Sequence, residues 1–190
     1  MSRYASFADL VRHERQDLDF RVVHVERSTS PVFIVAPHGG EIEVGTSELA
    51  GLIAGADHSL FCFEGLKPGG GSRDLHITSH RFDHPECLEL AARREVVVSV
   101  HGCVGQAQIY VGGLDEELRE RLARRLARAN FRVTAGGDKY PGRHPDNICN
   151  RGARNMGAQL EITHDLRGAP HRFPIAAAVR AGIADFLAID

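Results

Sequence analysis

Two short segments of the chain end an apolar run with a histidine followed by glycine. Residues 35–40 read Val-Ala-Pro-His-Gly-Gly, and residues 98–102 read Val-Ser-Val-His-Gly. We expect His38 and His101 to lie at strand ends, where the glycines let a ligand approach the backbone. Glu43 follows in the loop after His38. Two imidazoles and one carboxylate, with water in the fourth position, are the ligand set of a catalytic zinc site.

The spacing leaves part of this set open. Glu41 competes with Glu43 as the carboxylate ligand. Taken alone, His38 also fits a capping histidine whose ring is hydrogen-bonded to the backbone, and Glu43 fits a solvated loop acid. We place the other histidines, His76 among them, at the surface or around the site. Their number alone identifies no ligand.

Glu161 stands between Leu160 and Ile162 in an otherwise apolar segment. Burying a lone carboxylate costs free energy unless it has a partner or a task. A hydrolytic zinc site needs a general base that takes a proton from the water but does not bind the metal. We therefore predict Glu161 as this base. A cysteine nucleophile at Cys103, paired with His101, is the alternative, although a small buried thiol needs no catalytic role.

A polar segment precedes the predicted Glu161 strand. Residues 146–155 contain two arginines and three asparagines. Guanidinium groups bind carboxylates through forked donors, so we expect Arg151, Arg154 and Asn150 to bind a substrate carboxylate. Tyr140, in the loop before this segment, adds a phenol donor. The alternative is an ordinary polar loop in which Arg154 pairs with a surface acid.

The charge balance and the apolar runs limit the partners. The chain has 190 residues, with 23 Lys and Arg against 25 Asp and Glu, so it lacks the basic excess typical of nucleic-acid or anionic-membrane binding. No apolar run approaches the roughly 20 residues that span a bilayer, and the first residues lack the apolar core of a signal peptide. The four scattered cysteines are typical of reduced thiols. We expect a cytoplasmic monomer that binds neither nucleic acid nor membranes.

Strand and helix patterns alternate along the chain. We predict strands at residues 20–25, 32–37, 59–63, 75–78, 96–101, 108–111, 131–134 and 158–163. We predict helices at residues 6–13, 49–54 (capped by Thr46 or Ser47), 85–94, 115–129 and 175–189. This alternation predicts an α/β fold, a three-layer sandwich with a mixed, mostly parallel sheet, in a single domain over residues 1–190. Ligands of such sheets gather at the carboxyl ends of the strands, where His38, His101 and Glu161 would meet.

Several separated blocks of sequence occur in an order typical of one family. They are residues 36–40 with Glu43, then 45–50, 75–79, 98–102, 147–152 and 159–162. Over nearly the whole chain, from about Tyr4 to the closing helix, this pattern resembles the phage-related poly-γ-glutamate hydrolases. The resemblance implies a compact α/β fold like that of the zinc carboxypeptidases, and cleavage of γ-amide bonds in an acidic γ-glutamyl polymer or a related small substrate.

By motif matching, the resemblance implies that His38, Glu43 and His101 bind one zinc ion and that Glu161 is the catalytic acid/base. It favours Glu43, whereas the carboxypeptidase spacing of two residues between histidine and glutamate would select Glu41. Residues 79–84 are richer in histidine than the family pattern, which leaves the substrate preference open. Two other functions remain as alternatives: a zinc carboxypeptidase or N-acyl amino-acid deacylase, and a non-catalytic polyanion-binding module.

Overall fold

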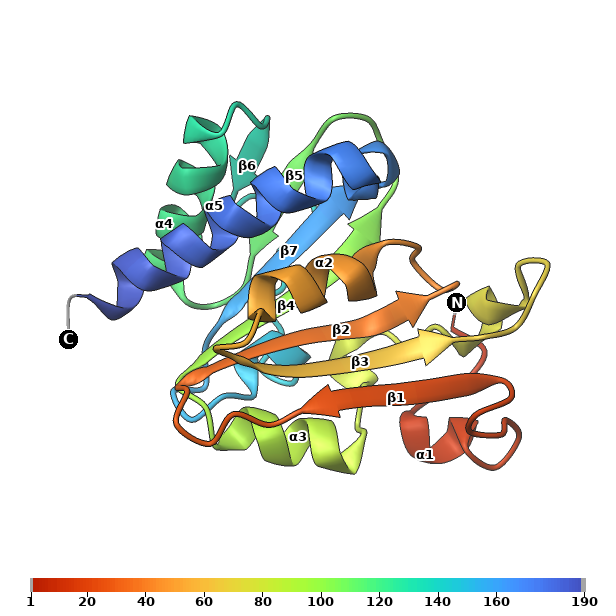
Figure 1. Ribbon diagram of the computed structural model, residues 1–190. Coiled ribbons are helices and arrows are strands. Elements are labelled where there is room, and N and C mark those ends of the chain that lie inside the picture. Colours follow the sequence, from red (N-terminus) through yellow and green to blue (C-terminus); the bar gives the residue numbers. More distant parts are fainter. Residues whose placement is uncertain (1, 189–190) are drawn as a thin grey trace.

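A seven-stranded mixed sheet forms the middle layer of the protein in the computed structural model, which describes residues 2–188 (Figure 1). The strands are β1 (Phe20–Val25), β2 (Val32–Gly40), β3 (Ser59–Gly65), β4 (Val96–Cys103), β5 (Ile109–Gly112), β6 (Val133–Ala135) and β7 (Ala158–Thr163). Their spatial order is β1-β3-β2-β4-β7-β5-β6. The β1–β3 and β5–β7 pairs are antiparallel and the other neighbouring pairs are parallel. The predicted mixed, mostly parallel sheet is confirmed.

Helices cover both faces of this sheet, as Figure 1 shows. The helices are α1 (Phe7–Leu10), α2 (Thr46–Ala54), α3 (Pro85–Ala92), α4 (Glu116–Arg128) and α5 (Ala169–Leu187). Side chains alternate between the faces of a strand, so Ile34 packs in the cluster under α2, α4 and α5, while Phe33 packs in the cluster under α1 and α3. The predicted three-layer α/β fold is thereby confirmed.

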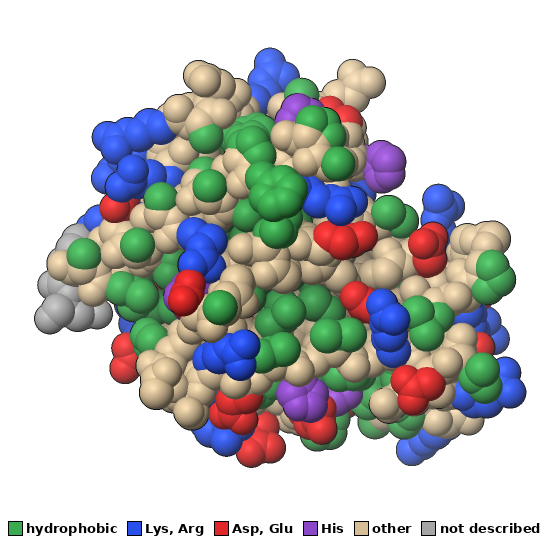
Figure 2. Space-filling model, in the orientation of Figure 1, with side chains coloured by type: hydrophobic (Ala, Val, Ile, Leu, Met, Phe, Trp, Pro, Cys, Tyr) green, Lys and Arg blue, Asp and Glu red, His purple; other side chains and the backbone are tan. Residues whose placement is uncertain are grey.

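Helix α4 illustrates how local sequence sets an element. Leu118, Leu122 and Leu126 recur with helical spacing and are fully buried. The Asp115 side chain accepts a hydrogen bond from the Leu118 N–H at 3.0 Å and so caps the first turn. The arginines of the opposite face contribute to the basic side chains that gather over α4 in Figure 2, whereas both charge signs are interspersed elsewhere on that face.

Some predicted elements differ from those observed. Residues 75–78 do not form a strand: a 3-10 helix, η1 (Gly71–Leu75), is followed by an extended segment with no strand partner. The prediction failed because Leu75 and Ile77 alternate as strand residues do, but both are buried in the α1/α3 cluster instead of pairing. Helix α1 is shorter than predicted. Helix α5 begins at Ala169, before the predicted start at residue 175, because Pro170 fits its first turn and Pro174 is accommodated inside it. The predicted end of this helix, residue 189, lies outside the described residues.

The predicted cap of α2 is also wrong. Gly45 occupies the N-cap position, with φ of 94°, and no side chain caps the helix. The Thr46 hydroxyl instead donates to the carbonyls of His38 and Glu43, at 3.2 and 2.9 Å. The hydroxyl therefore holds the turn after β2. No helix in the described part of the chain is both long and apolar enough to cross a bilayer.

Candidate active site and metal centre

An irregularity in the pairing of β2 with β3 positions His38. Strand β2 pairs with β3 at Ala36–Cys62 and again at Gly39–Glu64, so one extra residue of β2 lies between the two pairs. Such a bulge bends a strand and re-aims its side chains. His38 lies in this bulge, and the residue is 2% exposed.

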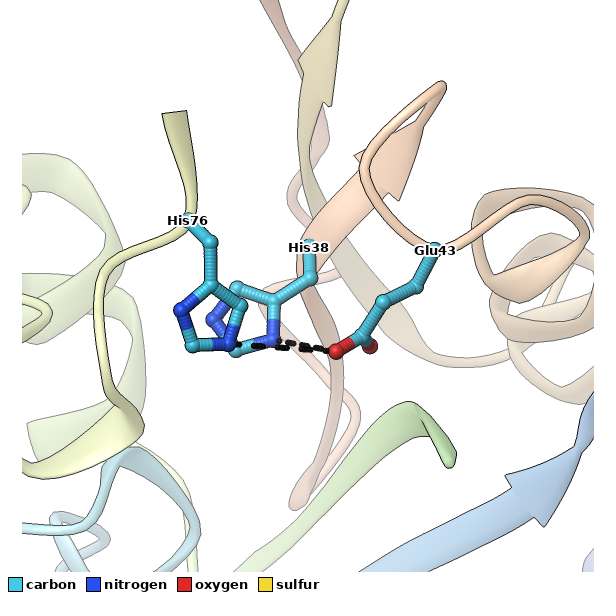
Figure 3. Close-up of side chains that lie close together, drawn as sticks. All are labelled: His38, Glu43 and His76. Carbon is cyan, nitrogen blue, oxygen red and sulfur yellow. Dashed lines mark ion pairs between the residues drawn. The ribbon is translucent and has the colours of Figure 1, made fainter. Parts of the chain in front are cut away.

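The turn after β2 returns the chain to His38. The Glu43 N–H donates to the His38 carbonyl at 2.9 Å. Gly40 has φ of 60°, and a Cβ atom there would lie 2.5 Å from the Gly65 carbonyl oxygen, so the turn requires glycine. As a result Glu43 Oε1 lies 3.2 Å from His38 Nδ1 (Figure 3).

Strands β4 and β7 bring the other two predicted residues to the same place. His101 and Glu161 are Cα partners in the parallel β4–β7 pair, so both side chains leave the sheet on one face. His101 Nδ1 lies 3.1 Å from His38 Nδ1 and 3.9 Å from Glu43 Oε2. Four residues separated by up to 123 positions thus meet at the carboxyl ends of three neighbouring strands.

Hydrogen bonds behind each ring determine which nitrogen faces the centre. His38 Nε2 lies 2.7 Å from the Ile77 carbonyl, which only accepts, so Nε2 carries the proton. In the neutral ring Nδ1 then presents its lone pair to the centre. His101 Nε2 lies 3.3 Å from Ser79 Oγ, which leaves its Nδ1 facing His38 and Glu43. Partners of this kind orient metal-binding histidines.

The spacing of the two imidazole nitrogens and the nearer carboxylate oxygen is close to that around a tetrahedral ion. Bonds of about 2.0–2.1 Å to tetrahedral zinc separate the ligand atoms by roughly 3.3 Å. His38 Nδ1 lies 3.1 Å from His101 Nδ1 and 3.2 Å from Glu43 Oε1, and the 3.9 Å separation joins His101 Nδ1 to the other carboxylate oxygen, Glu43 Oε2. The residues present therefore fit one zinc ion.

His76 also reaches this centre, although it was not among the ligands predicted from the sequence. It follows η1, and its Nε2 lies 3.9 Å from Glu43 Oε1 (Figure 3). Its ring centroid is 4.0 Å from that of His38, and donor atoms of His38, Glu43 and His76 all lie within 4.8 Å of one another. The sequence signal that could have identified His76 is its position between the apolar residues Leu75 and Ile77. Because residues 75–78 were predicted as a strand, His76 was not expected beside His38.

Burial and neighbouring charges shift the protonation of these groups. Burial lowers the pKa of His101 to about 3, helped by His38, and lowers the pKa of His76 to about 4. Burial alone would raise the pKa of Glu43, but His38, together with His101 and the Gly102 N–H, outweighs it and lowers that pKa to about 2. Burial likewise disfavours charge on His38, yet Glu43 raises its pKa. Neutral His101 and His76 and ionised Glu43 are the forms that bind a metal.

A chain of side-chain amides holds Glu161. The Cys149 N–H donates to Asn147 Oδ1 at 3.3 Å, so the Asn147 amide nitrogen is the donor to Gln159 Oε1, at 2.8 Å. Gln159 Nε2 in turn donates to Glu161 Oε1 at 3.0 Å. The Cys149 N–H therefore fixes the donor and acceptor of each hydrogen bond from Asn147 to Glu161. Oε1 of Glu161 is therefore an acceptor, and Oε2 does not take part in this chain of hydrogen bonds.

The environment of Glu161 disfavours its charge. Burial, and then the nearby Glu43 carboxylate, raise the pKa of Glu161 to about 9. A carboxyl group with so large a shift, at the wall of a cavity, is typical of an acid/base catalyst. A cavity of about 480 Å³ opens over the centre, and we call it the central cavity. Its walls include His38, Glu43, His76, His101, Tyr140 and Glu161.

Of the four predicted substrate residues, Tyr140 lines the central cavity. Asn150 is buried, and its amide nitrogen donates to the carbonyls of Gly142 and His144 at 2.8 and 2.9 Å. Its side-chain oxygen accepts hydrogen bonds from the N–H groups of Leu114 and Gly157. Asn150 thus shapes the loop at the cavity wall and has no donor left for a ligand.

The two predicted arginines lie outside the central cavity. Arg154 pairs with buried Asp115 at 2.7 Å, as in the alternative in which it meets an acid. Arg151 pairs with Asp146 at 2.9 Å and lines a neighbouring cavity of about 450 Å³. Their carboxylate-binding role remains a prediction that this geometry does not support.

The alternative cysteine nucleophile lies in an unfavourable environment. Cys103 is 8% exposed, and burial, together with Glu161, raises the pKa of its thiol to about 11. Catalytic cysteines instead have a lowered pKa, because the thiolate is the nucleophile. The environment therefore disfavours a cysteine hydrolase.

At the level of fold, the protein is similar to amidohydrolases and carboxypeptidases. N-formylglutamate amidohydrolase from Ralstonia eutropha JMP134 matches 90% of this chain and 99% of its own, with a TM-score of 0.57 and 13% identity. A protein assigned as carboxypeptidase A in Shewanella denitrificans OS-217 matches 90% of this chain and 61% of its own, with a TM-score of 0.53 and 15% identity. The class is thus the carboxypeptidase-like α/β fold, as predicted.

The family follows from closer matches. Residues 4–172 match the model of the poly-gamma-glutamate hydrolase family, and the chain belongs to this family. A bacteriophage poly-gamma-glutamate hydrolase has a TM-score of 0.95 and 28% identity over 100% of both chains. The zinc-free apo form of YndL has a TM-score of 0.90 and 30% identity, over 98% of this chain and 99% of its own. The predicted resemblance is confirmed.

Curated relatives in Bacillus subtilis (strain 168) are similar over most of the chain. UPF0714 protein YndL is 38% identical over 167 residues, which are 86% of this chain. SPbeta prophage-derived UPF0714 protein YoqZ is 34% identical over 168 residues, which are 87% of this chain. The chain spans 65% and 60% of the lengths of these two relatives.

Proposed function

We propose that the chain is a zinc-dependent amidohydrolase that cleaves γ-glutamyl amide bonds, with poly-γ-glutamate as its substrate. The observation that carries the proposal is the convergence of two imidazole nitrogens and the Glu43 carboxylate, at nearest printed separations of 3.1–3.9 Å, beside a buried carboxyl group. Membership of the poly-gamma-glutamate hydrolase family supports the substrate class. The zinc-free apo form of its relative YndL supports zinc as the metal.

His38, Glu43 and His101 would hold the ion through Nδ1, a carboxylate oxygen and Nδ1. Zinc in such a site supplies a Lewis acid that polarises the amide carbonyl and acidifies a water molecule. The Ile77 carbonyl and the Ser79 hydroxyl hold the two rings in the orientation that this binding needs. His76, beside His38, is a further donor at the edge of the centre.

Glu161 is the acid/base of the proposed reaction. It takes a proton from the attacking water on Oε2 and delivers it to the leaving amine, while Gln159 holds Oε1. A divalent cation nearby favours the ionised carboxylate, which is the form needed to start the cycle. The burial that raises its pKa then favours the protonated form that donates to the amine. A polyanion-binding module without catalysis would not need such a group.

The test compares bound zinc with turnover. Glu161→Gln should keep zinc and lose turnover, whereas His38→Ala should lose both. His24→Ala is the matched control, because His24 is an exposed histidine of β1 and its loss should change neither quantity. Equal zinc content in His38→Ala and the wild type would overturn the metal assignment.

A second experiment tests the substrate. The zinc-loaded protein is incubated with γ-linked and α-linked glutamyl polymers, and product lengths are read by mass spectrometry. Cleavage of the γ-linked polymer alone is expected. Cleavage of the α-linked polymer, or no cleavage of either, would refute the substrate class, and release of single terminal residues would favour a carboxypeptidase.

A further inference from the structure

A second cavity adjoins the central cavity. It has a volume of about 800 Å³, and we name it the Arg167 cavity after its buried cation. Glu43 and Gly102 line both cavities. A chain molecule whose amide lies at the metal centre can therefore extend from one cavity into the other.

Arg167 is a buried cation whose donors are only partly used. Arg167 is 6% exposed, and its Nη1 donates to the Val44 carbonyl. Nε is buried without a hydrogen-bond partner, Nη2 is not fully buried and forms no hydrogen bond within residues 2–188, and the guanidinium forms no ion pair there. Burying a charge without a paired anion is costly. The Glu43 and Glu161 carboxylates lie near enough to interact with this cation, but neither forms an ion pair with it, so a directly bound anion is expected to arrive with a ligand.

Gly102 gives this guanidinium its place beside the centre. A Cβ atom at residue 102 would lie 2.5 Å from Arg167 Cζ and 2.6 Å from Nη1. Gly102 follows the proposed ligand His101, and its N–H donates to Glu43 Oε2 at 2.7 Å. The cation thus lies against the backbone next to the proposed zinc ligands. Arg151 and Arg154, by contrast, already have carboxylate partners.

The other walls of the Arg167 cavity offer apolar surface. Ile42, Val44 and Val104 line it, and Val44 and Val104 are 43% and 79% exposed. Exposed apolar residues gathered at a cavity suit an apolar part of a ligand. Arg73 and His164 add donors, and the carboxylates of Glu41 and Glu43 also line the cavity, so the walls carry no general excess of positive charge.

These features match the chemistry of one γ-linked glutamyl residue. Such a residue carries two methylene groups in its backbone and one free α-carboxylate. We infer that the Arg167 cavity binds the glutamyl residue next to the scissile amide, with its α-carboxylate on Arg167 and its methylenes against Ile42, Val44 and Val104. The inference rests on the proposed function and adds the residue that recognises the substrate's charge.

The test replaces single carboxylates in the substrate. A set of γ-linked oligoglutamates carries isoglutamine, an α-carboxamide, at one position at a time, and cleavage is followed by mass spectrometry. For the wild type, an α-carboxamide at one of the positions beside the cleaved bond should lower kcat/KM by about 10- to 100-fold, as expected for loss of a charge-assisted hydrogen bond. Equal kcat/KM for carboxylate and carboxamide at every position would overturn the inference.

Variants then connect the effect to Arg167. Arg167→Gln should cleave the all-carboxylate substrate about 10- to 100-fold more slowly and should no longer distinguish the carboxamide. Arg124→Gln, an exposed arginine of α4, is the control and should discriminate like the wild type. Full discrimination by a folded Arg167→Gln protein would refute the role of Arg167. If this variant does not fold, the wild-type substrate series decides, and Arg167→Lys, which keeps the charge, should retain discrimination.

The two proposals fail in different ways. A wild-type protein that cleaves the γ-linked substrates without regard to the carboxylate refutes this inference alone. A zinc-loaded protein that is inert on every γ-linked substrate refutes the proposed function and the inference with it.

Discussion

Replacing Glu161 by glutamine should stabilise the metal-free protein, although the same change should abolish turnover. The carboxyl group is 9% exposed, and burial and Glu43 raise its pKa from 4.5 to about 9. The wild type must therefore either keep this group protonated or ionise it at a cost. Glutamine has nearly the same shape and carries no charge, so it can still accept from Gln159 through its carbonyl.

The pKa shift gives the direction and size of the effect. The unfolded chain releases the Glu161 proton near pH 4.5, whereas the folded protein keeps it until about pH 9. Between these values the unfolded state binds fewer protons, so the free energy of unfolding falls as the pH rises, by about 1.4 kcal/mol per pH unit. Relative to Glu161→Gln, the wild type should lose about 4 kcal/mol between pH 5 and pH 8.

Guanidinium chloride unfolding in the presence of a chelator measures this difference. Wild type and Glu161→Gln are compared at pH 5, 6, 7 and 8, and Glu120→Gln, an exposed acid of α4, controls for loss of a surface carboxylate. Zinc should reduce the slope, because a nearby cation favours the ionised carboxylate. Parallel pH profiles for wild type and Glu161→Gln without metal would show that Glu161 is not held neutral, and would refute the reasoning.

Three further predictions concern the groups around the centre. Gln159→Leu removes the donor to Glu161 Oε1, so kcat should fall about 10-fold while KM and zinc content stay near wild type; unchanged kcat would exclude a positioning role. Gly102→Ala should displace the guanidinium of Arg167 and lower kcat/KM, with a stability loss within about 1–3 kcal/mol in denaturant titrations; undiminished kcat/KM would contradict this. The Cys103→Ser variant should keep its hydrolytic activity, and a chelator should abolish that activity. Loss of hydrolysis in Cys103→Ser, with activity that resists the chelator in the wild type, would indicate a cysteine hydrolase.

Features that depend on local sequence were predicted well. The helical spacing of Leu118, Leu122 and Leu126, with Asp115 before them, predicts a capped amphipathic helix, and α4 has this form. The apolar runs before His38 and His101 predict strands of a parallel sheet, and β2 and β4 are such strands. These predictions succeed because side-chain period and capping act within one or two turns of the chain.

Features that depend on distant partners were predicted less well. Arg151 and Arg154 have the composition of a carboxylate site, but nearby acids pair with both. Arg167 stands in an unremarked segment after β7 and becomes important because Gly102, 65 positions earlier, leaves space for it. Pairing and burial of a charge are properties of the folded surroundings, which residue type does not disclose.

The sequence by itself determined the order of strands and helices along the chain, the family, and the residue types available for a metal and a base. Tertiary structure alone decided which atoms converge. The β2 bulge and the turn through Gly40 bring Glu43 Oε1 within 3.2 Å of His38 Nδ1, and the Ile77 carbonyl determines that Nδ1 is the nitrogen facing it. The physical reason is that metal binding and proton transfer require distances between groups far apart in the chain to be correct within a few tenths of an ångström, and only packing sets those distances.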